Sequence, residues 1–258
     1  MRIPVLALLI SFFPGFLGLS GGQELPASEY APILVPIKIN GPIHGGFGTI
    51  WSTSVTAYNS SSEPVPYFGK SCVLGVICPR HLIWPARSYG NPIDYSGHAG
   101  YILWVERSAI RDIHLSVRLN EITRGLEPVA EIPIIREAEL YTDSLQILDV
   151  PIRADARVLL RLYSIPRPHH TVSFVVTAYD RNDVVLGARR ISVKPITEST
   201  PLPIFPGYGE MDLWADFPDA RTSAVRLEIR AEEPDTLFWA FISLTDNGSQ
   251  RVRLINPS

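Results

Sequence analysis

The chain has 258 residues, and 23 Lys and Arg against 26 Asp and Glu give it a formal net charge of −3 at pH 7. Charges of both signs are mixed along the sequence, which argues against nucleic acid or an anionic membrane as a partner. A chain of this length can bury one large β-sheet core or two smaller ones.

Residues 1–22 have the pattern of a secretory signal peptide. Arg2 supplies a positive charge, an apolar run extends from Val5 to Leu19, and the small residues Ser20 to Gly22 follow. A permanent membrane helix needs about 20 uninterrupted apolar residues, whereas Pro14 interrupts this run. We therefore predict cleavage after Gly22 or, alternatively, after Ser20, a secreted or periplasmic location, and no stable membrane insertion after cleavage.

Alternating apolar and polar residues predict a first set of short strands within residues 23–140. Before the second of them Gly48 allows a positive φ, Trp51 can fill the core, and Asn59 suits the turn that follows. Residues 136–141 favour a brief helical connector. The predicted strands cover residues 33–39, 50–58, 65–68, 101–105, 113–119 and 130–135.

Cys72 and Cys78 are the only cysteines and enclose five residues. In an oxidising compartment such a pair is expected to form a disulfide. The spacing differs from that of a zinc site, and there is no second pair of ligands. We therefore predict a structural bridge rather than a metal site.

Four aromatic residues gather around the long loop that precedes residue 101: Trp84, Tyr89, Tyr95 and Tyr101. Coplanar exposed aromatic rings are the usual binding surface of a carbohydrate-binding module. These four are therefore the candidate aromatic binding surface of the chain.

A second set of strands is predicted within residues 141–258. The segment Val176–Asp180 repeats the pattern of Val55–Asn59, each time as a strand running into a polar turn. The prediction is therefore an all-β protein with two immunoglobulin-like antiparallel β-sandwich domains in tandem, 23–140 and 141–258. The strands of the second set cover residues 145–150, 158–163, 172–179, 184–193, 211–214, 225–229, 237–244 and 252–255.

Two segments of the second half carry more specific expectations. The prolines between residues 195 and 209 predict a loop that crosses between sheets rather than a polyproline ligand. In the strand 237–244 both faces are apolar at the start, with Trp239 and Phe241 opposite Phe238 and Ala240. An ordinary sandwich strand buries only one face, so we predict that Trp239 and Phe241 pack against the first domain or a long loop.

Several motifs of the chain resemble those of exported bacterial β-sandwich proteins of unknown function. They are the pattern from Gly45 through Gly48, Trp51, Thr53 and Val55 to Asn59, the cysteine loop, the segment 131–137, and the closing Phe-Trp-Ala-Phe-Ile-Ser-Leu-Thr-Asp-Asn of 238–247. The resemblance implies the fold and export, but it transfers no active site.

Residues with catalytic potential do not form a recognisable constellation. An acid, a hydroxyl and an imidazole lie within five residues of each other at Asp94, Ser96 and His98. Catalytic triads, however, are assembled from separate loops. The adjacent His169 and His170 would point to opposite faces of an extended segment. We predict no catalytic residue, no metal site and no cofactor, and therefore no enzyme.

These observations leave two classes of function and one lesser alternative. The first is a non-catalytic interaction or structural module outside the cell, with an unknown extracellular protein or glycan as partner. The second is a carbohydrate-binding module. The lesser alternative is a secreted hydrolase, because the fold decides whether two carboxylates face each other at the required distance.

Overall fold

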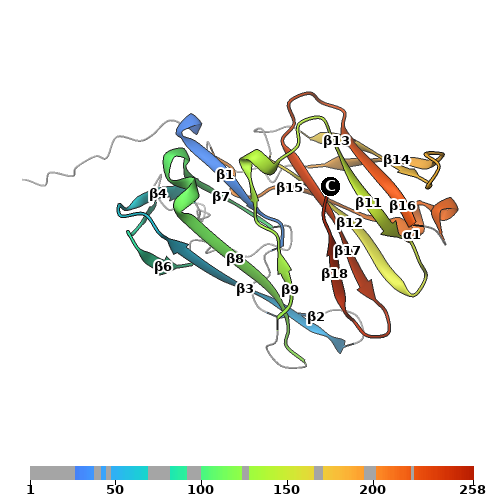
Figure 1. Ribbon diagram of the computed structural model, residues 1–258, viewed down its shortest axis with the longest axis horizontal. Coiled ribbons are helices and arrows are strands. Elements are labelled where there is room, and N and C mark those ends of the chain that lie inside the picture. Colours follow the sequence, from blue (N-terminus) through green and yellow to red (C-terminus); the bar gives the residue numbers. More distant parts are fainter. Residues whose placement is uncertain are drawn as a thin grey trace, which may run out of the picture.

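The computed structural model describes residues 27–37, 42–44, 48–68, 82–91, 100–123, 128–165, 171–194, 202–221 and 224–258. In these residues the fold is all-β, as predicted, and the strands form four antiparallel sheets. Strands β1 to β9 lie on one side of the molecule and strands β11 to β18 on the other (Figure 1). The immunoglobulin-like character and the domain limits 23–140 and 141–258 stay predictions.

The first two sheets form what we call the N-terminal sandwich. Sheet 1 has the order β10-β1-β7-β4-β5, and sheet 2 has the order β2-β3-β8-β9 with β6 beside β3. The strands of sheet 1 are β1 (Tyr30–Val35), β4 (Val65–Phe68), β5 (Leu82–Trp84), β7 (Tyr101–Glu106) and β10 (Ile135–Arg136). Those of sheet 2 are β2 (Ile43–His44), β3 (Ile50–Asn59), β6 (Ser88–Gly90), β8 (Ile113–Glu121) and β9 (Pro128–Ile132).

The other two sheets form the C-terminal sandwich. Sheet 3 has the order β11-β16-β13-β14, and sheet 4 has the order β15-β12-β17-β18. The strands of sheet 3 are β11 (Ser144–Pro151), β13 (Val172–Tyr179), β14 (Val185–Val193) and β16 (Ala224–Ala231). Those of sheet 4 are β12 (Ala156–Ser164), β15 (Gly207–Asp212), β17 (Phe238–Asp246) and β18 (Val252–Ile255).

Helices in the described residues are short. The α-helix α1 (Leu213–Asp216) begins at Asp212, whose carboxylate accepts hydrogen bonds from the backbone of Trp214 and Ala215. The remaining helices are 3-10 turns at Ala27–Glu29, Arg107–Asp112, Glu137–Glu139 and Pro218–Ala220. The turn at Glu137–Glu139 confirms the predicted helical connector.

Sheet 4 has buried apolar side chains on both faces, and this determines how the sandwiches are joined. Val158, Leu160 and Leu162 of β12 point into the C-terminal core. On the opposite face, Tyr163 and Ile165 belong to the same apolar cluster as the core of the N-terminal sandwich. The two sandwiches therefore share sheet 4, which packs against the C-terminal core on one face and against the N-terminal sandwich on the other.

Strand β17 shows the same division and confirms the prediction of a two-sided strand. Phe238 and Ala240 lie in the C-terminal core, whereas Trp239 and Phe241 lie in the cluster that includes the N-terminal sandwich. Trp239 is only 4% exposed and Phe241 is fully buried. The two rings therefore do not form an exposed aromatic platform, which is the other use that a strand with two apolar faces could have.

The connector between β14 and β15 crosses from sheet 3 to sheet 4, as predicted, and its described part packs on sheet 1. The backbone N–H of Ile102 donates to the carbonyl of Ile204 at 2.7 Å. The indole of Trp104 donates to the carbonyl of Pro203, also at 2.7 Å. These bonds attach the C-terminal sandwich to the central strand of sheet 1.

Several predicted strands have different limits in the structure, and the strand expected at 33–39 covers Tyr30–Val35 instead. The single strand expected at 130–135 is split, because β9 ends at Ile132 in sheet 2 and β10 begins at Ile135 in sheet 1. Pro133 lies at the crossing and has no N–H to donate to a sheet. The strand expected at 211–214 ends at Asp212, because that carboxylate caps α1 instead.

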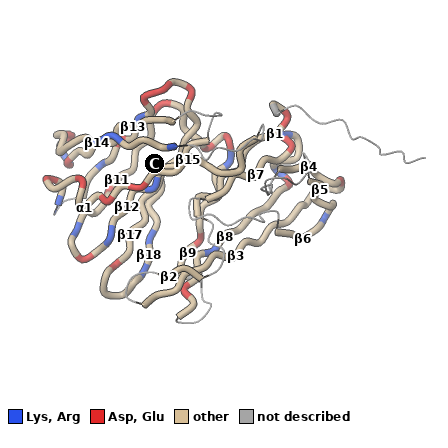
Figure 2. The backbone as a smooth tube through the Cα atoms, turned by 180° about the vertical axis from the view of Figure 1, so that it is seen from behind, with Lys and Arg blue, Asp and Glu red and all other residues tan. Residues whose placement is uncertain are grey.

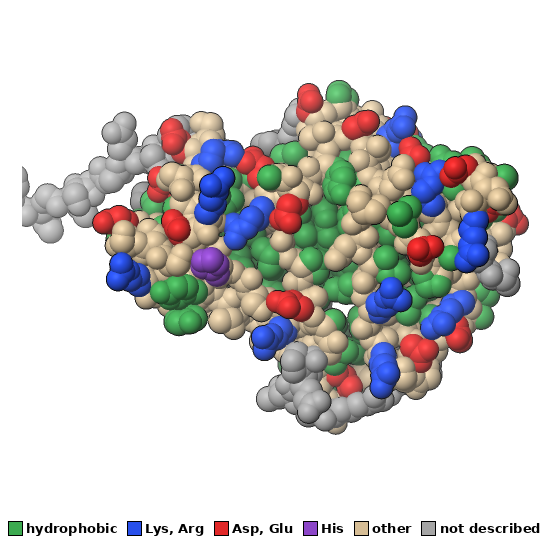
Figure 3. Space-filling model, viewed as in Figure 1, with side chains coloured by type: hydrophobic (Ala, Val, Ile, Leu, Met, Phe, Trp, Pro, Cys, Tyr) green, Lys and Arg blue, Asp and Glu red, His purple; other side chains and the backbone are tan. Residues whose placement is uncertain are grey.

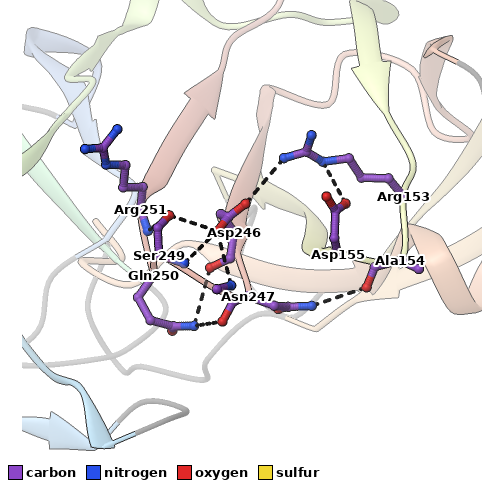
Figure 4. Close-up of polar contacts among 9 residues, drawn as sticks. Arg153, Ala154, Asp155, Asp246, Asn247, Ser249, Gln250 and Arg251 are labelled. Atoms are coloured by element: carbon purple, nitrogen blue, oxygen red, sulfur yellow. Dashed lines mark hydrogen bonds and ion pairs between the residues drawn. The ribbon is translucent and has the colours of Figure 1, made fainter.

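The turn between β17 and β18 is held by Asp246 (Figure 4). Its Oδ1 accepts hydrogen bonds from the backbone of Gly248 at 3.1 Å and of Ser249 at 2.7 Å, and from Ser249 Oγ at 2.8 Å. Arg153 Nη2 lies 3.6 Å from Asp246 Oδ2. The turn thereby fixes β18 against β17, where Val252 and Leu254 of β18 face the N-terminal sandwich.

Candidate functional site

A cleft of about 450 Å³ lies between sheet 4 and the N-terminal sandwich. The surface is hollowed where the two sandwiches meet, and hydrophobic side chains gather there in the face seen in Figure 3. Strands β2, β3 and β8 provide one wall, and strands β12, β15, β17 and β18 provide the other. The lining residues are Ile37, Ile43, His44, Trp51, Leu119, Arg157, Arg161, Tyr208, Glu210, Ser243, Thr245, Val252 and Leu254.

Strand register explains why one wall of the cleft is polar. Along the outer face of sheet 4, Tyr163 pairs with Trp239 and forms the apolar contact between the sandwiches. Arg161, two residues before Tyr163, pairs with Glu210 of β15. Arg157 lies further along the same face of β12 and pairs with Thr245 of β17. Because residues two apart in a strand share a face, the apolar contact passes directly into the polar wall.

Arg161 organises this wall. Its Nη1 donates to the hydroxyl of Tyr208 at 2.8 Å and lies 3.1 Å from Glu210 Oε2. Its Nε donates to Ser243 Oγ at 3.1 Å. The Tyr208 hydroxyl in turn donates a short hydrogen bond to Glu210. The guanidinium is thus held in place by side chains from β15 and β17, the two strands on either side of its own.

Burial changes the acidity of the tyrosines beside Arg161. Burial raises the pKa of the Tyr208 hydroxyl well above its ordinary value, although the positive charge of Arg161 opposes this shift. Burial likewise raises the pKa of Tyr163, which is completely buried behind the cleft. Both hydroxyls therefore stay protonated at neutral pH, and that of Tyr208 donates its proton to Glu210.

The opposite wall is largely apolar. Trp51 is half-buried, and its indole donates to Thr49 Oγ1 at 2.9 Å, which fixes the orientation of the ring. Ile37 and Leu119 lie beside it, and both are buried. The cleft thus places a fixed aromatic ring and aliphatic side chains opposite a row of hydrogen-bonding groups.

The side chains that line the cleft limit the chemistry that it can offer. Ser243 Oγ accepts a hydrogen bond from Arg161, a cation that cannot take the hydroxyl proton, so this contact does not activate Ser243 as a nucleophile. In the described ranges, no group of three or more His, Cys, Asp and Glu side chains is placed to hold a metal ion. Trp51, Arg161 and Tyr208 offer stacking and hydrogen bonding, which are the means of orienting a ligand.

The structure does not place the described residues of the predicted aromatic binding surface on one exposed face. Trp84 is 3% exposed and Tyr101 is fully buried, whereas Tyr89 is 76% exposed. Trp84 lies in β5 beside Val65, and Tyr101 begins the central strand β7, so both rings point into the N-terminal core. The prediction of exposure is therefore wrong for Trp84 and Tyr101, and Tyr95 lies outside the described residues.

A different aromatic row lies across sheet 2. Register places Tyr58 of β3 between Tyr89 of β6 and His114 of β8. The centroids of the Tyr58 and Tyr89 rings are 4.7 Å apart, and the His114 ring lies 6.4 Å from the Tyr58 ring with 27° between the two planes. Tyr89 and His114 are exposed. This row is a small aromatic surface that the sequence analysis did not identify.

Other predicted features lie outside the described residues. They are the signal peptide 1–22, Cys72 and Cys78, the group Asp94, Ser96 and His98, and the pair His169 and His170. Their roles stay predictions.

Sequence reasoning also missed Arg161, Tyr208 and Glu210. One signal was present, because Arg161 interrupts the apolar run of residues 158–163 on the face that it shares with Tyr163. A charged residue within such a run indicates either an edge position or a partner on another strand. The partner itself was not visible, because Glu210 is 49 residues further along the chain.

In the part of the chain that the structure describes, no helix has the length and apolar character needed to cross a membrane. No protein-family model, no curated protein and no solved structure matches the chain. The resemblance to exported bacterial β-sandwich proteins therefore stays a prediction.

Proposed function

We propose that the protein is an exported, non-catalytic binding module whose ligand occupies the cleft between the two sandwiches. The observation that carries the proposal is the cleft of about 450 Å³, lined by a fixed indole on one side and the Arg161 network on the other. This volume lies within the range of about 300 to 1,000 Å³ that is typical of small-molecule sites.

The buried connection between the sandwiches supports this role. Trp239 and Phe241 belong to the shared apolar cluster, so the walls of the cleft are held at a fixed separation. A preformed site loses less conformational entropy when a ligand binds. Export is supported by the signal-like residues 1–22 alone and is part of the proposal.

Charge on the rest of the surface does not favour a nucleic acid. Basic and acidic positions alternate over both sandwiches, without a broad basic stripe among the described residues (Figure 2). Nucleic-acid-binding surfaces are usually marked by clustered Lys and Arg. A small ligand in the cleft fits this distribution better than a polyanionic chain on the surface.

Filling the cleft with a larger side chain tests whether it is the binding site. Val252 is a half-buried residue of the edge strand β18 and lines the cleft. Replacing it by Trp should block ligand binding while the sandwich cores stay intact. A small-molecule library screened by NMR should yield ligands that shift the Trp51 indole signal in the wild type and not in Val252→Trp. If ligands shift other signals but never that of Trp51, the proposal is wrong.

The second candidate is a carbohydrate-binding module that uses the row Tyr89, Tyr58 and His114. Exposed aromatic rings stack on the apolar faces of sugars, and Tyr89 is the most exposed of the large apolar side chains in the described residues. A glycan array should then give binding that Tyr89→Ala abolishes and Val252→Trp leaves unchanged. The opposite pattern would assign binding to the cleft.

A further inference from the structure

The charges that line the cleft are unbalanced. Arg157 and Arg161 both line it, but Glu210 is the one carboxylate among the lining residues. Glu210 pairs with Arg161 at 3.1 Å. Arg157 is exposed, and no carboxylate in the described ranges forms an ion pair with it. One positive charge therefore remains uncompensated on this wall.

Strand register places this charge beside apolar side chains. Arg157 of β12 pairs with Thr245 of β17, which in turn pairs with Val252 of β18. In the next row on the same face, Leu254 pairs with Ser243. Arg157 and Arg161 are four residues apart in one strand, which places their Cα atoms about 13 Å from each other. The free charge thus lies at one end of an apolar surface, away from the Arg161 network.

We propose that the cleft binds a small amphipathic anion, such as a carboxylate with an apolar body. Arg157 binds the anionic group at the exposed end of the cleft. The apolar body lies between Val252 and Leu254 on one wall and Trp51 on the other. This inference rests on the proposed function and specifies the chemical class of its ligand.

The alternative ligand classes fit the lining less well. A cation would face Arg157 without a free carboxylate in the described wall to compensate it, and like charges repel. A neutral ligand of the same shape gains the apolar contacts but leaves Arg157 without a partner. A guanidinium and a carboxylate form strong charge-assisted hydrogen bonds, so an anion is selected over both.

The test uses three probes with the same apolar chain, namely sodium octanoate, 1-octanol and octyltrimethylammonium, added to the full-length protein. Binding is followed by the NMR signal of the Trp51 indole N–H, which Trp51→Phe identifies among the five tryptophans. Octanoate is expected to shift this signal at the lowest concentration, octanol to bind more weakly, and the cation not to bind. Arg157→Gln should weaken octanoate binding about tenfold, because a charge-assisted contact is lost.

The matched control is Arg111→Gln. Arg111 is also exposed, but it lies in the 3-10 helix Arg107–Asp112, away from the cleft. It should leave octanoate binding unchanged. If octanoate and octanol bind equally well and Arg157→Gln has no effect, the preference for an anion is wrong while the cleft remains the binding site. If no probe shifts the Trp51 signal, both this inference and the proposed function of the cleft fail.

Discussion

The rings of Trp239 and Phe241 lie with their centroids 5.3 Å apart, on the face of β17 that points away from the C-terminal core. The Phe241 ring is also stacked on Tyr163 of β12, with the two rings within 6° of parallel. These three side chains form the apolar contact that joins sheet 4 to the N-terminal sandwich. Immediately beyond them the same face becomes polar and forms a wall of the cleft.

Trp239→Ala should lower the free energy of unfolding by about 3 to 5 kcal/mol, because it removes a buried indole and leaves a cavity. Urea denaturation followed by circular dichroism measures the change. Tyr89→Ala is the control, since Tyr89 is exposed and its removal should cost less than about 0.5 kcal/mol. An unchanged unfolding midpoint for Trp239→Ala would show that the indole does not contribute to the contact between the sandwiches.

Arg161 and Glu210 should be energetically coupled. Arg161→Met removes the donor to Tyr208 and Ser243 and should destabilise the protein by about 1 to 3 kcal/mol. A double-mutant cycle with Glu210→Gln should give a coupling energy of about 1 kcal/mol. This value is modest because the Glu210 side chain remains partly exposed, where solvent screens the ion pair. Strictly additive effects of the two substitutions would contradict the network.

Asp246 should make stability depend on pH in the acidic range. Hydrogen bonds from the backbone and hydroxyl of Ser249 lower the pKa of Asp246 below its ordinary value of 3.8. The stabilisation by the charged form is therefore complete above about pH 4 and is lost as the pH falls through the lower folded value. Asp246→Asn keeps an acceptor oxygen but removes the charge.

The measurement compares urea midpoints of the wild type and Asp246→Asn at several pH values. The wild type should be the more stable protein at neutral pH, and the difference should shrink as the solution is acidified below about pH 4. A difference that stays constant over this range would show that the charge of Asp246 does not stabilise the turn.

Cys72 and Cys78 should be bridged in protein secreted into an oxidising compartment, where paired cysteines form disulfides. Intact-mass analysis after alkylation without a reductant should find no labelled thiol. After reduction, two labels should be added. Two labels without reduction would overturn the prediction.

The sequence predicted the fold well because several strands alternate between buried and less buried residues, as β13 (Val172–Tyr179) does along its whole length. The echo between Val55–Asn59 and Val176–Asp180 also has a physical basis, because both segments end in the same kind of turn. Asn59 Oδ1 accepts from the backbone of Ser61, and Asp180 Oδ1 accepts from Asn182 and Val184. Gly48 has the positive φ that the pattern predicted, at 74°.

The site was predicted less well, because exposure depends on the partners of a strand and not on its own sequence. The sequence places Trp84 beside a long loop, yet it lies in β5, where pairing with β4 turns the indole into the core. The cleft combines side chains from seven strands of both sandwiches, and no local pattern indicates that these strands converge. Among the residues that line the cleft, the sequence analysis names Trp51 alone, and it predicts a core position for this residue.

Because both sandwiches share sheet 4, their unfolding should be cooperative. Neither sandwich can detach without exposing Tyr163, Trp239 and Phe241 to water, which opposes independent unfolding of the halves. The chain should therefore melt in a single transition, like one domain of its full size, although its strands divide into two sets. A C-terminal half expressed alone would carry an uncovered aromatic face and would be prone to aggregation.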